Sequence, residues 1–171
     1  MPVSLPELVV GSAPASADMY LDLTLRRGGK VKGESLASGH ADDIVVSGWS
    51  WGVGAAGDAV TGQQTGRRSY RHLVIQKGLD SASTALMSAV ATNDEVRNAV
   101  LYLRKAGGSQ EDFFTLTLEK ARIASYDVES GRDGSPVERV AFAFQKVEIE
   151  YRTQSASGVL GASHSFNDDL G

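Results

Sequence analysis

Apolar and polar residues alternate along most of this chain, a pattern typical of β-strands that bury one face. Residues 19–26 show the alternation most clearly, because Met19, Leu21 and Leu23 are each followed by a more polar residue. Similar runs predict further strands over residues 43–51, 70–77, 96–105, 113–125, 137–152 and 162–166. We therefore expect a mainly β fold, a compact β-barrel of about seven to nine strands.

One segment has a helical rather than a strand period. Between residues 81 and 91, Ala82, Leu86 and Ala89 recur at intervals of three and four, which places them on one face of a helix. Asp80 stands where a carboxylate accepts a backbone N–H at a helix start, and Asn93 stands where the helix is expected to end. We therefore predict one α-helix that flanks the barrel.

Two changes of parity predict that the long strands bend. Phe144 and Val147 are both apolar but would point to opposite faces of a regular strand, so we expect a β-bulge near residues 145–146. Leu118 and Ala121 predict a second bend for the same reason. Such bends allow a small sheet to curve and close into a barrel.

The strand over residues 43–51 ends in two tryptophans and runs into a glycine-rich segment. One face of a regular strand would carry Val45, Ser47, Trp49 and Trp51. Residues 53–69 then show neither a helical nor a strand period, so we predict an extended loop, which we call the arm. A rigid strand that carries a long arm favours an assembling protein over an enzyme.

Composition narrows the class of protein. The 171 residues are enough for one domain with a substantial core, and the absence of cysteine excludes disulfides and thiolate metal sites. The net charge of -4 and the lack of a basic cluster argue against binding to nucleic acid. Because no apolar run approaches the roughly 20 residues of a membrane helix, we expect no membrane insertion.

The first residues lack the strand pattern. Residues 15–17 read Ala-Ser-Ala, like a signal-peptidase site, but neither a basic region nor an uninterrupted apolar region precedes them. We therefore predict an N-terminal extension over residues 1–17 and a β-barrel domain over residues 18–168. If this protein leaves the cell, we expect it to do so without a cleaved signal peptide.

Two short motifs look like catalytic signatures without the structural context that those signatures need. Residues 48–52 spell G-x-S-x-G around Ser50, the nucleophile elbow of serine hydrolases, which requires a helix directly after the serine. The glycine-rich residues that follow are unsuited to such a helix. Residues 57–64 have the glycine spacing of a P-loop but lack the lysine and the hydroxyl residue that hold phosphate and magnesium.

No other group of residues has the spacing of a catalytic or metal site. His40, His72 and His164 lie far apart in the chain and form no metal-binding motif, so we predict no metal and no cofactor. Glu148 and Glu150 share a strand face, where such a pair is typically solvated rather than catalytic. We therefore expect that the protein is not an enzyme.

Five short segments, taken in order, carry a resemblance to a known family. They are residues 32–35 (KGES), 49–52 (WSWG), 77–83 (KGLDSAS), 103–108 (LRKAGG) and 144–151 (FQKVEIEY). Together they resemble the Hcp family (hemolysin-coregulated protein), the tube protein of the bacterial type VI secretion system, over residues 18–168. The resemblance implies a β-barrel with one flanking helix, which is similar to phage tail-tube proteins. It also implies a structural subunit: hexameric rings stack into a tube inside a contractile sheath.

The resemblance further implies partners and a route of export. A VgrG spike caps the tube, effectors travel in its lumen, and the protein passes from the bacterial cytoplasm through the type VI apparatus. The arm matches the family's extended arm, which reaches a neighbouring ring or subunit, with Arg67 and Arg68 as charged stacking contacts. The assembly residues expected on this basis are Val53, Gly57, Thr61, Gln63, Gln64, Arg67 and Arg68.

Two alternatives stay open at this point. A small-molecule-binding β-barrel would use the two tryptophans to line a cavity. A serine hydrolase would use Ser50 as its nucleophile.

Overall fold

Nine antiparallel strands, joined in one hydrogen-bonded sheet, make up most of the described part of the chain. The computed structural model describes residues 17–57, 60–62, 64–107, 110–155 and 159–171. In chain order the elements are β1 (Ala17–Leu25), β2 (Gly29–Lys30), β3 (Ile44–Val46), β4 (Gly48–Gly57), β5 (Gln64–Gly78), α1 (Ser83–Thr92), β6 (Glu95–Lys105), β7 (Asp112–Ser130), β8 (Pro136–Gln154) and β9 (Leu160–Asp169). The predicted mainly β class with one helix is therefore confirmed.

The predicted N-terminal extension lies outside the described residues except for Ala17, which is the first residue of β1. The division of the chain into an extension and a domain over residues 18–168 therefore stays a prediction.

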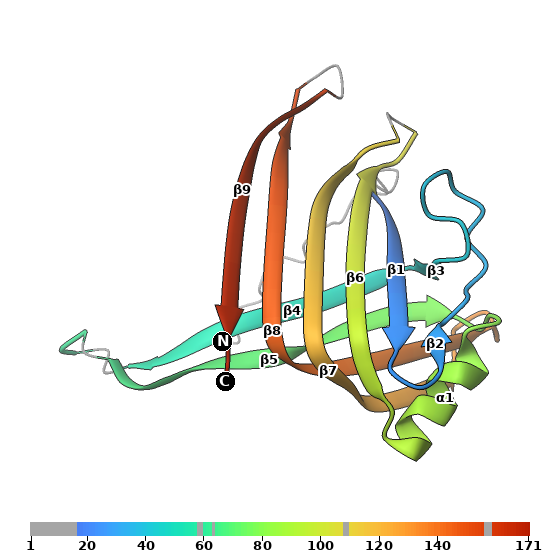
Figure 1. Cartoon of the computed structure of the whole chain (residues 1–171), viewed down its shortest axis with the longest axis horizontal. Helices are drawn as coiled ribbons and strands as arrows, with labels where there is room; N and C mark the ends of the chain where they lie inside the picture. Colours follow the sequence, from blue (N-terminus) through green and yellow to red (C-terminus); the bar gives the residue numbers. More distant parts are fainter. Residues whose placement is uncertain (1–16, 58–59, 63, 108–109, 156–158) are drawn as a thin grey trace, which may run out of the picture.

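The sheet folds over on itself because β8 changes its neighbour along its length. Residues 137–142 of β8 pair with β5, whereas residues 146–154 pair with β9. Figure 1 shows the result: β9, β8, β7, β6 and β1 stand side by side, and β4 and β5 cross behind them. At one end of the sheet the last strand is β4, which pairs with β5. At the other end β3 pairs with β1, and no ladder joins β3 to β4 in the described residues. The expected barrel is therefore a strongly bent sheet that no continuous ladder closes.

The bend in β7 and β8 arises differently from the predicted bulge at residues 145–146. Glu119 pairs with Lys146, and Ala121 pairs with Phe144, so the register is unchanged across the bend. Instead, the backbone at Lys120 adopts the left-handed region, with φ of 50°. The register shift in this pair lies further along β7, between residues 123 and 125. The parity therefore reverses through a kink rather than through one inserted residue.

The predicted common face of Val45, Ser47, Trp49 and Trp51 is wrong. Both tryptophans pack against the core, whereas Val45 and Ser47 are exposed. The reason is that the segment is two strands: β3 pairs with β1, and β4 pairs with β5. The break at Ser47, where the backbone N–H donates to the Gln76 carbonyl at 2.8 Å, resets which side chains face inward.

The arm is a β-hairpin where the sequence pattern predicted a loop. Val53 pairs with Tyr70, and the ladder continues to the pair of Gly57 and Gln64. Figure 1 shows this hairpin projecting beyond the rest of the sheet. Ladder hydrogen bonds come from the backbone, so a hairpin with both faces in solvent forms without an alternating apolar pattern.

The helix α1 covers one end of the sheet and starts two residues later than residue 81, where it was predicted to begin. Ala82 is the N-cap, and Asp80 accepts a hydrogen bond from the Ala82 backbone at 2.9 Å in a turn before the helix. The end at Asn93 is confirmed, since this residue is left-handed with φ of 53°. In the described part of the chain, no helix has the length and apolar character to cross a membrane.

One apolar core lies between the two layers and α1. Its largest members have no accessible surface: Leu21, Leu23, Ile44, Leu73, Ile75, Leu86, Leu101, Leu116, Leu118 and Phe142. They come from β1, β3, β5, β6, β7, β8 and α1, so the core depends on pairings between segments that are distant in sequence.

A buried ion pair joins the end of β5 to β8 and to the start of α1. The Lys77 ammonium contacts Glu138 at 2.7 Å and Asp80 at 2.9 Å, and it donates to the Ser83 hydroxyl at 3.1 Å. The side chains of Lys77 and Glu138 are both fully buried. A buried charge that loses its partner is strongly destabilising, so this cluster holds the strand-to-helix connection in one conformation.

We expect Lys77→Met to lower the free energy of unfolding by about 3–5 kcal/mol, because the Glu138 carboxylate stays buried without its cation. Urea unfolding at fixed protein concentration, followed by tryptophan fluorescence, measures the change. The matched control is Arg139→Gln, which breaks an exposed ion pair with Glu129 and should cost less than about 1 kcal/mol. Equally small effects of both substitutions would show that the buried pair does not hold the connection.

Candidate assembly surface

A cluster of three polar residues fastens the base of the arm to the last strand. Arg68 and Tyr70 lie two residues apart on β5 and therefore point to the same face of the hairpin. The Arg68 guanidinium donates to Asp168 Oδ1 at 2.9 Å, and its Nε contacts the other carboxylate oxygen. The Tyr70 hydroxyl also donates to Asp168, at 2.5 Å. One carboxylate of β9 thus orients the arm.

The electrostatics of this cluster favour the ionised carboxylate. Hydrogen bonds from Arg68 and then from Tyr70 lower the pKa of Asp168 to about 2. The pKa of Tyr70 is raised, first by desolvation and then by its bond to Asp168. The pKa of Arg68 is raised by the same carboxylate. The three groups therefore stay as cation, neutral phenol and anion over the whole physiological pH range.

Aromatic rings support the arm from beneath. Trp51 packs against Tyr70 with ring centroids 5.7 Å apart, and Tyr70 meets Phe144 edge-on at 5.7 Å. Trp49 packs against Phe114 at 5.3 Å. Both tryptophans are thus engaged in packing between rings, and the alternative of a small-molecule-binding barrel is not supported.

Six of the seven predicted assembly residues lie in the described part of the arm, and they differ from one another in their surroundings. Val53, Thr61 and Arg67 are exposed, and Arg67 forms no ion pair with any residue that the structure describes. Gly57 and Gln64 pair through their backbones. Gln63 lies outside the described residues.

Arg68, predicted as a contact to another subunit, is engaged with Asp168 of its own chain. The sequence pattern missed Asp168 because it lies in a polar, Gly- and Ser-rich tail, where only residues 162–166 indicated a strand. Phe166 already ends that predicted strand, and the polar residues 167–169 that follow carry no signal that extends it to Asp168.

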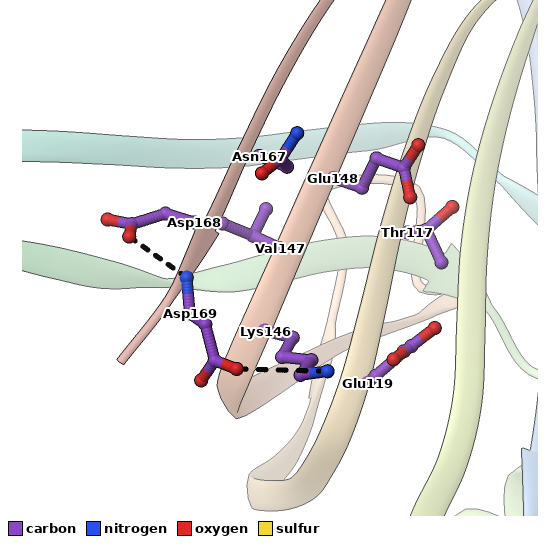
Figure 2. Close-up of a pocket in the computed structure, with 8 residues that line it drawn as sticks. All are labelled: Thr117, Glu119, Lys146, Val147, Glu148, Asn167, Asp168 and Asp169. Carbon is purple, nitrogen blue, oxygen red and sulfur yellow. Dashed lines mark hydrogen bonds and ion pairs between the residues drawn. The ribbon is translucent and has the colours of Figure 1, made fainter. Parts of the chain in front are cut away.

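A shallow depression of about 430 Å³ lies beside this cluster, across β7, β8 and β9 (Figure 2). Its lining comprises Thr117, Glu119, Lys146, Val147, Glu148, Asn167, Asp168 and Asp169. Lys146 and Asp169 form an ion pair at 3.7 Å, and Glu148 is exposed as predicted for a solvated face. No group of His, Cys, Asp and Glu in the described residues could hold a metal ion. Within the described residues, no hydrogen bond joins the Thr117 hydroxyl to Glu119 or Glu148, so the depression shows no nucleophile activated by a base.

The histidines do not assemble a hydrolase site. Ser50 is exposed within β4, which continues through it instead of turning into a helix. His72 and His164 are exposed on β5 and β9, and neither hydrogen-bonds to Ser50 in the part of the chain that the structure describes. The nucleophile-elbow motif is therefore a coincidence of composition.

His40 is buried, and its contacts are structural. Its Nδ1 lies 2.9 Å from Asp43, and its Nε2 lies 2.9 Å from Asp112. The ring stacks on Tyr20 at a centroid distance of 4.6 Å and meets Tyr102 at the same distance. His40 thus ties the connection between β2 and β3 to the sheet.

The chain is similar to one group of known proteins. The family model described as "Type VI secretion system effector, Hcp" matches residues 20–151. "Protein hcp1" of Pseudomonas aeruginosa is 31% identical over 147 residues, which cover 84% of this chain and 88% of that protein. "Major exported protein" of the same bacterium is 28% identical over 135 residues, which cover 74% and 78%. A solved type six secretion system protein has a TM-score of 0.80 at 28% identity, covering 90% of this chain and 95% of that one.

We expect the Asp168 carboxyl to titrate near pH 2 and to titrate at higher pH in Arg68→Gln, which removes the main stabiliser of the anion. The folded pKa of Asp168 lies below the ordinary aspartate value of about 3.9. The ionised carboxylate therefore adds to the free energy of unfolding above that pH, and this contribution is lost as the pH falls through about 2. Carbon-13 NMR of the side-chain carboxyl measures both midpoints.

The matched control for this titration is Arg67→Gln, which removes a neighbouring charge that makes no ion pair with a described residue. Its midpoint should equal that of the unsubstituted protein. A midpoint that moves equally in both variants would mean that general charge, rather than the Arg68 contact, sets the pKa of Asp168.

Proposed function

This chain belongs to the Hcp family, the tube proteins of the type VI secretion system, and on that premise we propose that six copies close into a ring and that rings stack into a tube. The family is structural and not enzymatic. The observation that carries the proposal is the arm, a paired hairpin that projects from the sheet while an ion pair holds its base. Such a rigid projection suits contact with another subunit.

Unpaired strand edges also support assembly. In the described residues, β9 pairs only with β8, and β4 pairs only with β5, so each leaves one edge without a partner. Exposed edges invite uncontrolled pairing, and proteins usually cover them. A ring of identical copies covers such edges by contact with the neighbouring subunit.

Within this proposal, the exposed arm residues make the contacts to a neighbouring ring or subunit. Val53, Thr61 and Arg67 are exposed on the arm, whereas Arg68 orients the arm within its own chain. The backbone pairing of Gly57 and Gln64 keeps the arm extended.

We extend the proposal to the rest of the apparatus by family membership. The tube would meet a VgrG spike at its tip, a contractile sheath around it and effectors in its lumen. The protein would start in the bacterial cytoplasm and leave through the apparatus without a cleaved signal peptide. The relative described as a major exported protein supports export as the destination.

Native mass spectrometry of the purified protein should give a species of six times the 18.1 kDa chain. A stable ring needs interfaces of at least about 1,000 Å² in total between neighbours, so the species should persist at micromolar concentration. A spectrum that contains only monomer across that range would overturn the proposal.

Shortening the arm tests its role separately. Residues 56–67 are replaced by Asn-Gly, a two-residue turn that suits the flanking pair of Ala55 and Arg68. The variant keeps the Arg68–Asp168 contact, so we expect an unchanged circular dichroism spectrum and an intact ring. Electron microscopy should show loss of stacked rings, and secretion should fall at least tenfold. Normal secretion by this variant would refute the arm's role.

A further inference from the structure

The apolar face of the front layer runs out to the edge strand. Residues in register across β1, β6, β7, β8 and β9 form one row: Leu21, Leu101, Leu116, Ile149 and Phe166. The first three are fully buried, but Phe166 is 43% exposed, and Tyr151 beside it is 44% exposed. The row is therefore covered at its β1, β6 and β7 positions and open to solvent at its β9 end.

The edge of β9 lacks the features that protect an exposed strand. Edge strands are usually short, or they carry lysine or proline that discourages pairing. β9 has ten residues, LGASHSFNDD, with no lysine and no proline, and its two aspartates lie together at one end and pair with Arg68 and Lys146. An aromatic patch at an unprotected edge marks an interaction surface.

A complementary hollow lies at the opposite end of the same sheet. Val45 on β3 and Leu79 in the β5–α1 connection are 50% and 57% exposed. They line a mostly apolar depression of about 260 Å³ together with Glu34, Ser47, Gly78 and Asp80. A cavity of about 150 Å³ is enough to hold benzene, so this hollow has room for one phenyl ring.

The hollow is rigid, which suits it to receive a side chain. Asp80 contacts the buried Lys77 at 2.9 Å, and its carboxylate also accepts from the Ala82 backbone. Leu79 therefore sits on a connection that is held on both sides. Glu34 and Asp80 place carboxylate acceptors at the rim, and His164, two residues before Phe166 on the same face of β9, carries a ring N–H donor.

We propose that Phe166 of one copy inserts into the Val45–Leu79 hollow of the next copy around the ring, an inference that rests on the proposed ring. Four strands, β8, β7, β6 and β1, lie between β9 and β3 in the sheet. The separation is five strand spacings, or about 24 Å along the sheet, so Phe166 does not fill the hollow of its own chain. A knob and a hole at opposite ends of one molecule make a head-to-tail contact, which closes into a ring when the rotation allows.

Cross-linking tests the contact while Phe166 stays in place. Because the chain has no cysteine, His164→Cys with Ser47→Cys introduces one thiol beside the knob and one in the hollow. A short bis-maleimide should give a ladder of covalent oligomers up to six chains on a denaturing gel. The matched control pairs His164→Cys with Val128→Cys, an exposed position on β7 outside the hollow, and should give no ladder.

A second variant tests the energetics. Phe166→Glu should abolish the cross-linked oligomers and reduce the ring to monomers at micromolar concentration. Val128→Glu should leave the ring intact. Circular dichroism verifies that both variants are folded. If the unsubstituted protein forms rings but the thiols at 164 and 47 do not link, this contact is wrong and the proposed function stands. If the unsubstituted protein forms no ring, both fail.

Discussion

Two strands, β7 and β8, run through both layers of the molecule, and their pairing constrains everything else. Their register is kept through the kink at Lys120, so the two halves of this ladder turn together. In one half β8 pairs with β9, and in the other half β8 pairs with β5. The kink at Lys120 and the register shift between residues 123 and 125 lie where the two layers meet, so the backbone there determines the angle between the layers. The core, the arm and the edge of β9 take their positions from it.

Two ion pairs hold connections between elements, one in the interior and one at the surface. The Lys77–Glu138 pair lies fully inside and holds a connection from strand to helix. The Arg68–Asp168 pair lies at the surface and joins the arm to the last strand. The first is expected to matter for stability, because desolvated charges need their partners. The second contributes orientation more than free energy, since water screens the attraction between charges at the surface.

The sequence predicted those elements that bury one face and missed those that do not. β1, β6 and the helix end at Asn93 follow from alternation and from a left-handed cap. The arm has little apolar character, and its strands were predicted as a loop. The middle of β9 was predicted over residues 162–166, but its polar end at residues 167–169 was not. Asp168 was missed because it lies beyond the predicted end of this strand. The family resemblance predicted that the arm is an assembly element, but periodicity alone did not reveal the pairing of its two strands.

The arm's ladder rests on main-chain groups, so its exposed side chains other than Arg68 can change without loss of the ladder. If the arm makes the proposed contacts, substitutions there would change which partners fit while the fold stays the same. Bacteria can carry more than one such protein, as the two relatives from Pseudomonas aeruginosa illustrate. Divergence of the arm's side chains would then keep subunits of coexisting paralogues from assembling into the same filament.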